Sequence, residues 1–157
     1  MKNKKLYNLL ANQGKSITFA ESITGGKLAA KLIEVPGASK VIKESYICYN
    51  DISKQKILGI SKDLINRYGV VSKEVAEAMN SGLKEITKAD VYVSITGNAG
   101  PTYQNGGNKL QVAFVAVECG LNKSVFKIEL TSGSRVKNIK TAVSKTYDYL
   151  IDLLETY

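Results

Sequence analysis

Ser22 stands in the segment AESITGG, between an apolar run typical of a strand and a run with helical spacing. A serine at such a turn acts as a nucleophile when nearby backbone N–H groups stabilise the oxyanion formed by its attack. Gly25 and Gly26 would expose N–H groups at a helix N-terminus, where partial positive charge also favours a phosphate. Thr24 could instead simply cap the helix while the glycines form the turn. The local pattern leaves both interpretations open.

The chain contains no histidine, and this limits the choice of a base. A Ser-His-Asp triad, a Cys-His pair and a His-ligated metal are all excluded. In the segment YNDISKQ, Lys54 is a candidate base, because burial or nearby positive charge lowers the pKa of a lysine towards neutrality. Tyr49 in the same segment could relay a proton or donate a hydrogen bond. The structural alternatives are a solvated lysine and a tyrosine packed in the core.

Two further segments carry candidate ligand contacts. In SITGNAGP, Thr96 and Gly97 follow an apolar run, and the turn at Gly100 and Pro101 would let backbone amides approach a ligand closely. Arg135, in TSGSR, lies at the start of the last helical segment. Its guanidinium either grips a phosphate through two hydrogen bonds or faces water.

Periodicity predicts the elements that position these residues. Helices are expected over 4–13, 24–34, 51–59, 72–86 and 136–154, and strands over 16–20, 41–49, 91–96, 110–118 and 124–130, with a polar loop over 102–109. The last two strands are close enough to form a hairpin. The order predicts a single domain over 1–157 with an α/β fold, a three-layer α/β/α sandwich on a mixed, roughly five-stranded sheet. Since ligands gather where strands end, 20–26 and 96–101 are expected to share one pocket.

Composition excludes several classes of protein. The chain has 157 residues, of which 44% are hydrophobic, so it can bury a core without disulfides or metal. Its apolar runs are too short to span a membrane and its first residues do not resemble a signal peptide, so a cytoplasmic protein is expected. Cys48 and Cys119 are expected to be reduced and packed. The net charge of +8 comes from lysines scattered singly along the chain, which favours solubility over nucleic-acid binding.

Five segments, in order, resemble the CinA C-terminal domain family, which includes the PncC-type nicotinamide-nucleotide amidases. They are AESITGG, VPGASKVIKESYICYNDISKQKILGI, YGVVSKEVAEAM, SITGNAGP and GSR. The resemblance runs from about Lys5 to Leu154. It leaves no room for the molybdopterin-binding-like domain that is also common in the family, so the stand-alone form is expected.

The resemblance implies hydrolysis of the carboxamide of nicotinamide mononucleotide by a Ser-Lys mechanism, in a homodimer, without metal or redox cofactor. Ser22, Lys54 and Tyr49 match the serine, lysine and tyrosine of the family. The expected substrate-binding residues are Thr24, Gly25, Gly26, Thr96, Gly97, Ala99, Gly100 and Arg135. Two alternatives are a catalytically silent nucleotide-binding or interaction protein linked to competence or DNA repair, and direct nucleic-acid binding.

The chain also departs from the family pattern. Asn50 and Asp51 replace a Ser-Asn pair, Asn98 replaces an apolar residue, Gln111 replaces a glycine and Ser134 replaces an acidic residue. These changes leave the serine, tyrosine and lysine in place, and they put an unchanged mode of substrate binding in question.

Overall fold

The computed structural model describes residues 1–101 and 111–157, so the polar loop expected over 102–109 lies outside the described residues. Five strands form one mixed sheet in the order β2-β1-β3-β4-β5. The first three run parallel, and β4 and β5 form the expected antiparallel hairpin. The strands are β1 (Ile17–Glu21), β2 (Tyr46–Ile47), β3 (Val91–Gly97), β4 (Val112–Cys119) and β5 (Asn122–Glu129).

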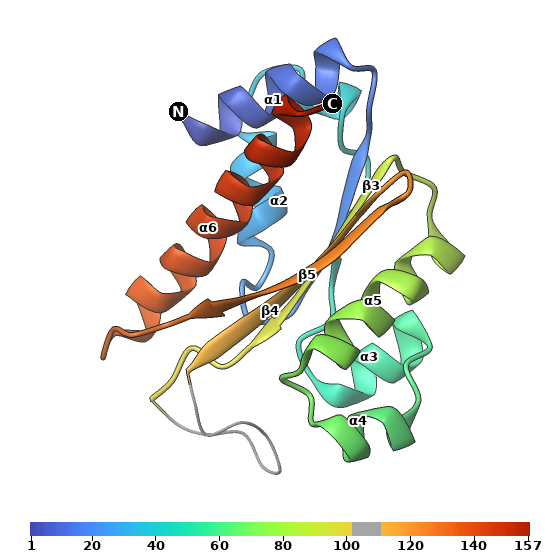
Figure 1. Cartoon of the computed structure of the whole chain (residues 1–157), viewed down its shortest axis with the longest axis vertical. Coiled ribbons are helices and arrows are strands. Elements are labelled where there is room, and N and C mark those ends of the chain that lie inside the picture. Colours follow the sequence, from blue (N-terminus) through green and yellow to red (C-terminus); the bar gives the residue numbers. More distant parts are fainter. Residues whose placement is uncertain (102–110) are drawn as a thin grey trace.

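Helices cover both faces of this sheet (Figure 1). On one face lie α1 (Lys2–Asn12), α2 (Lys27–Ile33) and α6 (Arg135–Glu155). On the other lie α3 (Asp51–Leu58), α4 (Lys62–Tyr68) and α5 (Lys73–Ile86), and a short 3-10 helix, η1 (Ala38–Lys40), precedes β2. The predicted three-layer α/β/α sandwich is therefore confirmed. In the described part of the chain, no helix is long and apolar enough to cross a membrane.

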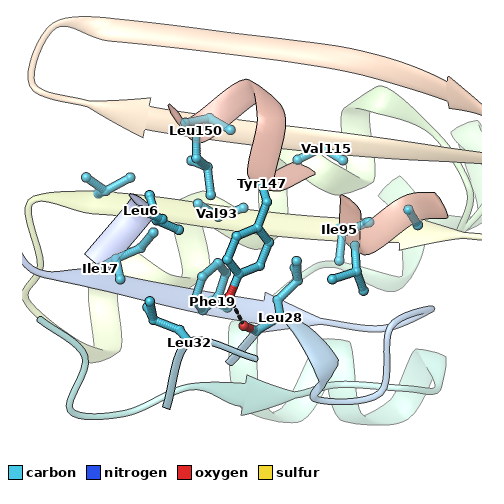
Figure 2. Close-up of a cluster of buried hydrophobic side chains, with 14 of the residues drawn as sticks. Leu6, Ile17, Phe19, Leu28, Leu32, Val93, Ile95, Val115, Tyr147 and Leu150 are labelled. Atoms are coloured by element: carbon cyan, nitrogen blue, oxygen red, sulfur yellow. Dashed lines mark hydrogen bonds between the residues drawn. The ribbon is translucent and has the colours of Figure 1, made fainter. Parts of the chain in front are cut away.

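Each face of the sheet has its own apolar core, because side chains alternate between the two faces of a strand. Under α1, α2 and α6 the core includes Leu6, Phe19, Leu28 and Val93 (Figure 2). The core under α3, α4 and α5 includes Ala20 and Cys48. Both cysteines are free and buried, as predicted.

The carboxyl ends of the parallel strands meet at one edge of the sheet. Glu21 of β1 is paired with Ile47 of β2 and with Ile95 of β3. The residues that directly follow these three are Ser22, Cys48 and Thr96. The strand register thus brings the two sequence-predicted segments, 20–26 and 96–101, to the same edge.

Several local predictions are wrong. The strand expected over 41–49 is reduced to Tyr46–Ile47, because the amides of Val41 and Ile42 both donate to the Ala38 carbonyl and continue the turn of η1. Helix α4 was not predicted.

Tyr147 joins α6 to α2 across the larger core. Its ring is fully buried and its hydroxyl donates to the Leu28 carbonyl oxygen at 2.7 Å, the contact drawn as a dashed line in Figure 2. A buried tyrosine hydroxyl needs such a partner, and so does the carbonyl that accepts from it.

We predict that Tyr147→Phe lowers the free energy of unfolding by about 1–2 kcal/mol, because it leaves the Leu28 carbonyl without this donor. Urea denaturation followed by circular dichroism measures the change. Tyr7→Phe, at a partly buried tyrosine beside the same core, is the matched control and should change stability less. Equal effects of the two substitutions would contradict this role.

Candidate active site

Ser22 and Lys54 meet at the carboxyl edge of the sheet. The Lys54 Nζ lies 2.9 Å from the Ser22 Oγ, within the range for a nucleophile and its base. Ser22 is only 4% exposed and Lys54 is 0% exposed, although lysine is almost never fully buried without a reason. The structure therefore brings together the two residues proposed from the sequence as nucleophile and base.

The start of α3 fixes the position of Lys54. Asn50 accepts a hydrogen bond from the Ser53 amide, and the Ser53 hydroxyl oxygen accepts one from the Asn50 amide, so the two form a capping box. At the other end of α3, Leu58 is buried in the core under α5. A helix held at both ends directs Lys54, which lies in its first half, towards the end of β1.

Two backbone carbonyls orient the Lys54 amine. The Nζ lies 2.8 Å from the Cys48 carbonyl oxygen and 3.3 Å from that of Tyr49. A neutral amine has two N–H groups and one lone pair. If the two N–H groups donate to these carbonyls, the lone pair is left for the Ser22 hydroxyl. The arrangement thus suits Lys54 as an acceptor of the Ser22 proton.

Burial also adjusts the protonation of Lys54. Loss of water around the ammonium lowers its pKa from 10.5 to about 8, and the negative charges of Asp51 and of an ionised Cys48 act in the opposite direction. A lysine with this pKa has an appreciable neutral fraction near pH 7 to 8. The carbonyl contacts and the lowered pKa together make Lys54 competent as a general base.

Glu21 occupies the N-terminus of α2, where the sequence alone would allow a phosphate. This carboxylate is fully buried. It accepts hydrogen bonds from the Thr24 hydroxyl at 2.6 Å and from the amides of Leu28 and Ala29 at 2.8 and 3.1 Å. The idea that Thr24 caps the helix is therefore wrong, because its hydroxyl donates to Glu21. The partial positive charge of the helix end is balanced from inside the protein.

The turn after Ser22 retains amides that can stabilise an oxyanion. The amide of Gly25, which was expected to contribute, donates instead to the Ser22 carbonyl oxygen at 3.1 Å. Within the described residues, the amides of Ile23, Thr24 and Gly26 have no hydrogen-bond partner. Gly25 and Gly26 have φ values of +58° and +98°, which only glycine adopts readily, so the turn itself depends on them.

Thr96 and Gly97 end β3 beside Ser22. The Thr96 hydroxyl is buried and donates to the Val70 carbonyl oxygen at 2.8 Å. Gly97 packs against β4 so closely that a Cβ would lie 2.8 Å from the Val112 carbonyl oxygen. Thr96 thus lies beside Ser22, and close packing against β4 requires a glycine at position 97. Contact of either residue with a substrate stays a prediction.

Arg135, the first residue of α6, contacts two segments beside the site. Its Nη1 donates to the Gly100 carbonyl oxygen at 2.8 Å and its Nη2 donates to the Tyr49 hydroxyl at 2.9 Å. The Tyr49 side chain is 56% exposed, so the alternative of a core tyrosine is wrong. Tyr49 therefore contacts Lys54 through its carbonyl and Arg135 through its hydroxyl.

Three side chains hold the 97–101 turn, those of Asn98, Gln111 and Asn138, and Asn138 was not predicted. The Asn138 Nδ2 donates to the Ala99 carbonyl oxygen at 3.0 Å, and the Asn98 Oδ1 accepts from the Gly100 amide at 2.9 Å. The Gln111 side chain lies against Gly100, where a Cβ would approach its Oε1 to 2.0 Å. Asn98 and Gln111, two of the departures from the family pattern, thus help to shape this turn.

Comparison with known proteins identifies the family. The family model of the CinA C-terminal domain matches residues 2–154. The chain belongs to the CinA C-terminal domain family. CinA-like proteins of Petrotoga mobilis and Kosmotoga olearia are 35% identical over 150 residues and 36% identical over 143 residues, or 95% and 91% of this chain. The chain spans 37% and 34% of these two relatives, about a third of their length.

Solved structures of CinA relatives share the fold at nearly full length. The competence or damage-inducible protein from Enterobacter asburiae superposes with a TM-score of 0.91 at 27% identity, covering 98% of this chain and 96% of its own. A CinA superfamily protein from Enterobacter cloacae gives a TM-score of 0.90 at 29% identity, covering 98% and 90%. The CinA fold is thus common to chains that share little more than a quarter of their residues.

The burial of Lys54 predicts a pH-dependent stability. Below about pH 8 the lysine is charged in the folded and the unfolded chain, and the folded chain bears the full cost of burying the charge. Between about pH 8 and 10.5 the unfolded chain binds more protons, so stability rises with pH. Over this pH interval, the free energy of unfolding of the wild type should rise by up to roughly 3 kcal/mol relative to that of Lys54→Met.

Urea denaturation of both proteins at several pH values measures this difference, and other titrating groups cancel in the comparison. Lys56→Met, at an exposed lysine on the same helix, should run parallel to the wild type. A constant difference between wild type and Lys54→Met from pH 7 to 10.5 would contradict the lowered pKa of Lys54.

Proposed function

We propose that the protein is an amidase that hydrolyses the carboxamide of nicotinamide mononucleotide to nicotinate mononucleotide and ammonia. The observation that carries the proposal is the contact between the Lys54 Nζ and the Ser22 Oγ, 2.9 Å apart and shielded from water. The resemblance to the nicotinamide-nucleotide amidases of the family supplies the substrate. The site supplies a nucleophile, a base and candidate oxyanion donors for that reaction.

In the proposed reaction, the Ser22 hydroxyl transfers its proton to the neutral Lys54 amine as its Oγ forms a bond to the amide carbon. The oxyanion that develops on the carboxamide oxygen accepts hydrogen bonds from amides of the 22–26 turn, each worth about 3 kcal/mol. When the C–N bond breaks, Lys54 returns the proton to the departing ammonia. An acyl-serine and a neutral Lys54 remain.

Water then completes the cycle. Lys54 accepts a proton from the attacking water, the second tetrahedral intermediate collapses, and the Ser22 Oγ leaves with the proton from Lys54. The product is a carboxylic acid, which releases its proton to solvent and becomes a carboxylate, and both residues return to their starting state. The reaction needs no change of oxidation state, and a single lysine acts alternately as base and acid.

Arg135 and Tyr49 are the proposed contacts for the nucleotide part of the substrate. Both lie at the mouth of the site, with Tyr49 56% exposed and the two side chains joined by a hydrogen bond. A guanidinium suits a phosphate and a tyrosine ring suits a flat heterocycle. Thr96, beside Ser22 in the sheet register, is proposed to line the same pocket.

The first prediction for this function concerns the two reacting residues. Ser22→Ala should reduce ammonia release from nicotinamide mononucleotide by at least about 1,000-fold, and Lys54→Met by roughly 100- to 10,000-fold. A coupled glutamate dehydrogenase assay measures the ammonia. Lys56→Met, on an exposed face of α3, is the control and should retain activity.

Two outcomes would contradict the proposal. Binding of nicotinamide mononucleotide by the wild type without turnover at any pH would indicate a catalytically silent protein. Undiminished ammonia release by Ser22→Ala would show that the hydrolysis does not use this serine.

The second prediction concerns pH. Because only neutral Lys54 accepts the proton, kcat/KM should rise with pH and level off above an apparent pKa near 8. Asp51→Asn removes a negative charge that raises the pKa of Lys54, so it should move this midpoint to lower pH. Asp63→Asn, on α4, should leave it unchanged. A profile that is flat between pH 6 and 9 would contradict the role of Lys54 as base.

A further inference from the structure

A basic groove lies between α2 and α6, on the face of the sheet opposite Lys54. Its volume is about 390 Å³. Three lysines line it, Lys27 and Lys31 from α2 and Lys140 from α6, and Glu34 is the one acidic residue among the described residues that line it. Residues scattered singly along the sequence are thus brought together by the packing of two helices.

Every charged residue in α2 and in the first half of α6 is basic. Helix α2 contains two lysines and no acidic residue. The first half of α6, residues 135–145, contains one arginine and three lysines and again no acidic residue. In the part of the chain that the structure describes, no ion pair includes Lys27, Lys31 or Lys140. The positive charge of the groove is therefore not balanced by ion pairing within those residues.

The grouping of positive charges on α2 and α6 lowers the stability of the folded protein. Lys27 and Lys31 are four residues apart on one helix, a spacing at which like charges repel by a few tenths of a kcal/mol. Lys27 and Arg135 are the first residues of α2 and α6, where a positive charge opposes the helix dipole. In contrast, the first turns of α3, α4 and α5 each contain an acidic residue. The basic side chains of α2 and of the first half of α6 therefore do not add to the stability of these helices.

The groove begins next to the active site. Helix α2 follows directly from the turn that holds Ser22, and α6 begins with Arg135, whose guanidinium binds the Tyr49 hydroxyl. Since the Glu21 carboxylate already occupies the N-terminus of α2, attraction of an anion to this side depends on the lysine side chains. Their field extends over about 10 Å at moderate salt, and Lys27 lies only five residues after Ser22.

We propose that the groove lined by Lys27, Lys31 and Lys140 attracts the phosphate of the substrate and so favours phosphorylated over unphosphorylated amides. This inference rests on the proposed function and adds to it a determinant of substrate class. A surface of uncompensated positive charge beside a pocket raises the local concentration of an anionic ligand, and salt screens the effect.

The test uses a triple variant, Lys27→Gln with Lys31→Gln and Lys140→Gln, and a control triple variant that removes three charges at the opposite edge of the sheet. Exposed lysines with no ion pair among the described residues supply the control, namely Lys40, Lys43 and Lys88. Both sets are placed in the Ser22→Ala background, which prevents turnover. Isothermal titration calorimetry gives the Kd of nicotinamide mononucleotide and of nicotinamide riboside, the same amide without the phosphate.

At about 20 mM salt, the groove variant should bind the mononucleotide at least about five-fold more weakly, and the control variant less than about two-fold. The difference should disappear at about 300 mM salt, and the Kd of the riboside should stay unchanged throughout. Equal weakening by the two triple variants, or equal weakening for the riboside, would overturn the inference while leaving the proposed function intact.

A failure of the proposed function gives a different result. If nicotinamide mononucleotide is not a ligand of the protein, Ser22→Ala binds neither amide, and inorganic pyrophosphate becomes the probe for the wild-type protein and both triple variants. Binding of pyrophosphate that is weakened only in the groove variant would support an anion-binding groove. Identical binding to all three proteins, or none to any, would overturn it.

Discussion

A lysine amine kept from water beside a serine hydroxyl is the constraint on which the site depends. Burying Lys54 is costly because the ammonium loses its hydration, and the contacts with Ser22 and with the carbonyls of Cys48 and Tyr49 offset this cost only in part. The remaining cost appears as a lowered pKa. The fold thus gives up some stability to hold an amine that can be neutral near physiological pH.

The surrounding elements can be understood as supports for that contact. Parallel β1, β2 and β3 place Ser22, Cys48 and Thr96 side by side. Glu21 ties the turn after Ser22 to the start of α2 with three hydrogen bonds. Arg135 connects the start of α6 to Gly100 and to Tyr49, which lie on two different segments beside the site. Each of the three layers therefore contributes to the geometry of one small region.

Much of this could be predicted from the sequence because the signals were local. Because the chain contains no histidine, Lys54 is the candidate base. The order of helical and strand-like patterns indicated the α/β/α sandwich. The short β2 was not predictable from its β-branched run, because the hydrogen bonds of Val41 and Ile42 return to η1. Helix α4 buries only Ile65 among its seven residues, so it has no apolar periodicity that stands out.

Other features depend on packing that one sequence does not reveal. Glu21 was overlooked because its role requires α2 to lie over the end of β1, although an acidic residue at the end of an apolar strand is itself a signal. The burial of Lys54 depends on α3 packing against α5. The grouping of Lys27, Lys31 and Lys140 requires two helices more than 100 residues apart in the sequence to line one groove.

The most direct measurement is the pKa of the Lys54 side chain in the folded protein, obtained by NMR from the pH dependence of its 13Cε shift in protein labelled at lysine. Comparison with Lys54→Met assigns the signal. We expect a midpoint near 8 for Lys54, well below 10.5, the ordinary pKa of a lysine side chain. Titration of Lys54 near 10.5 would contradict this account.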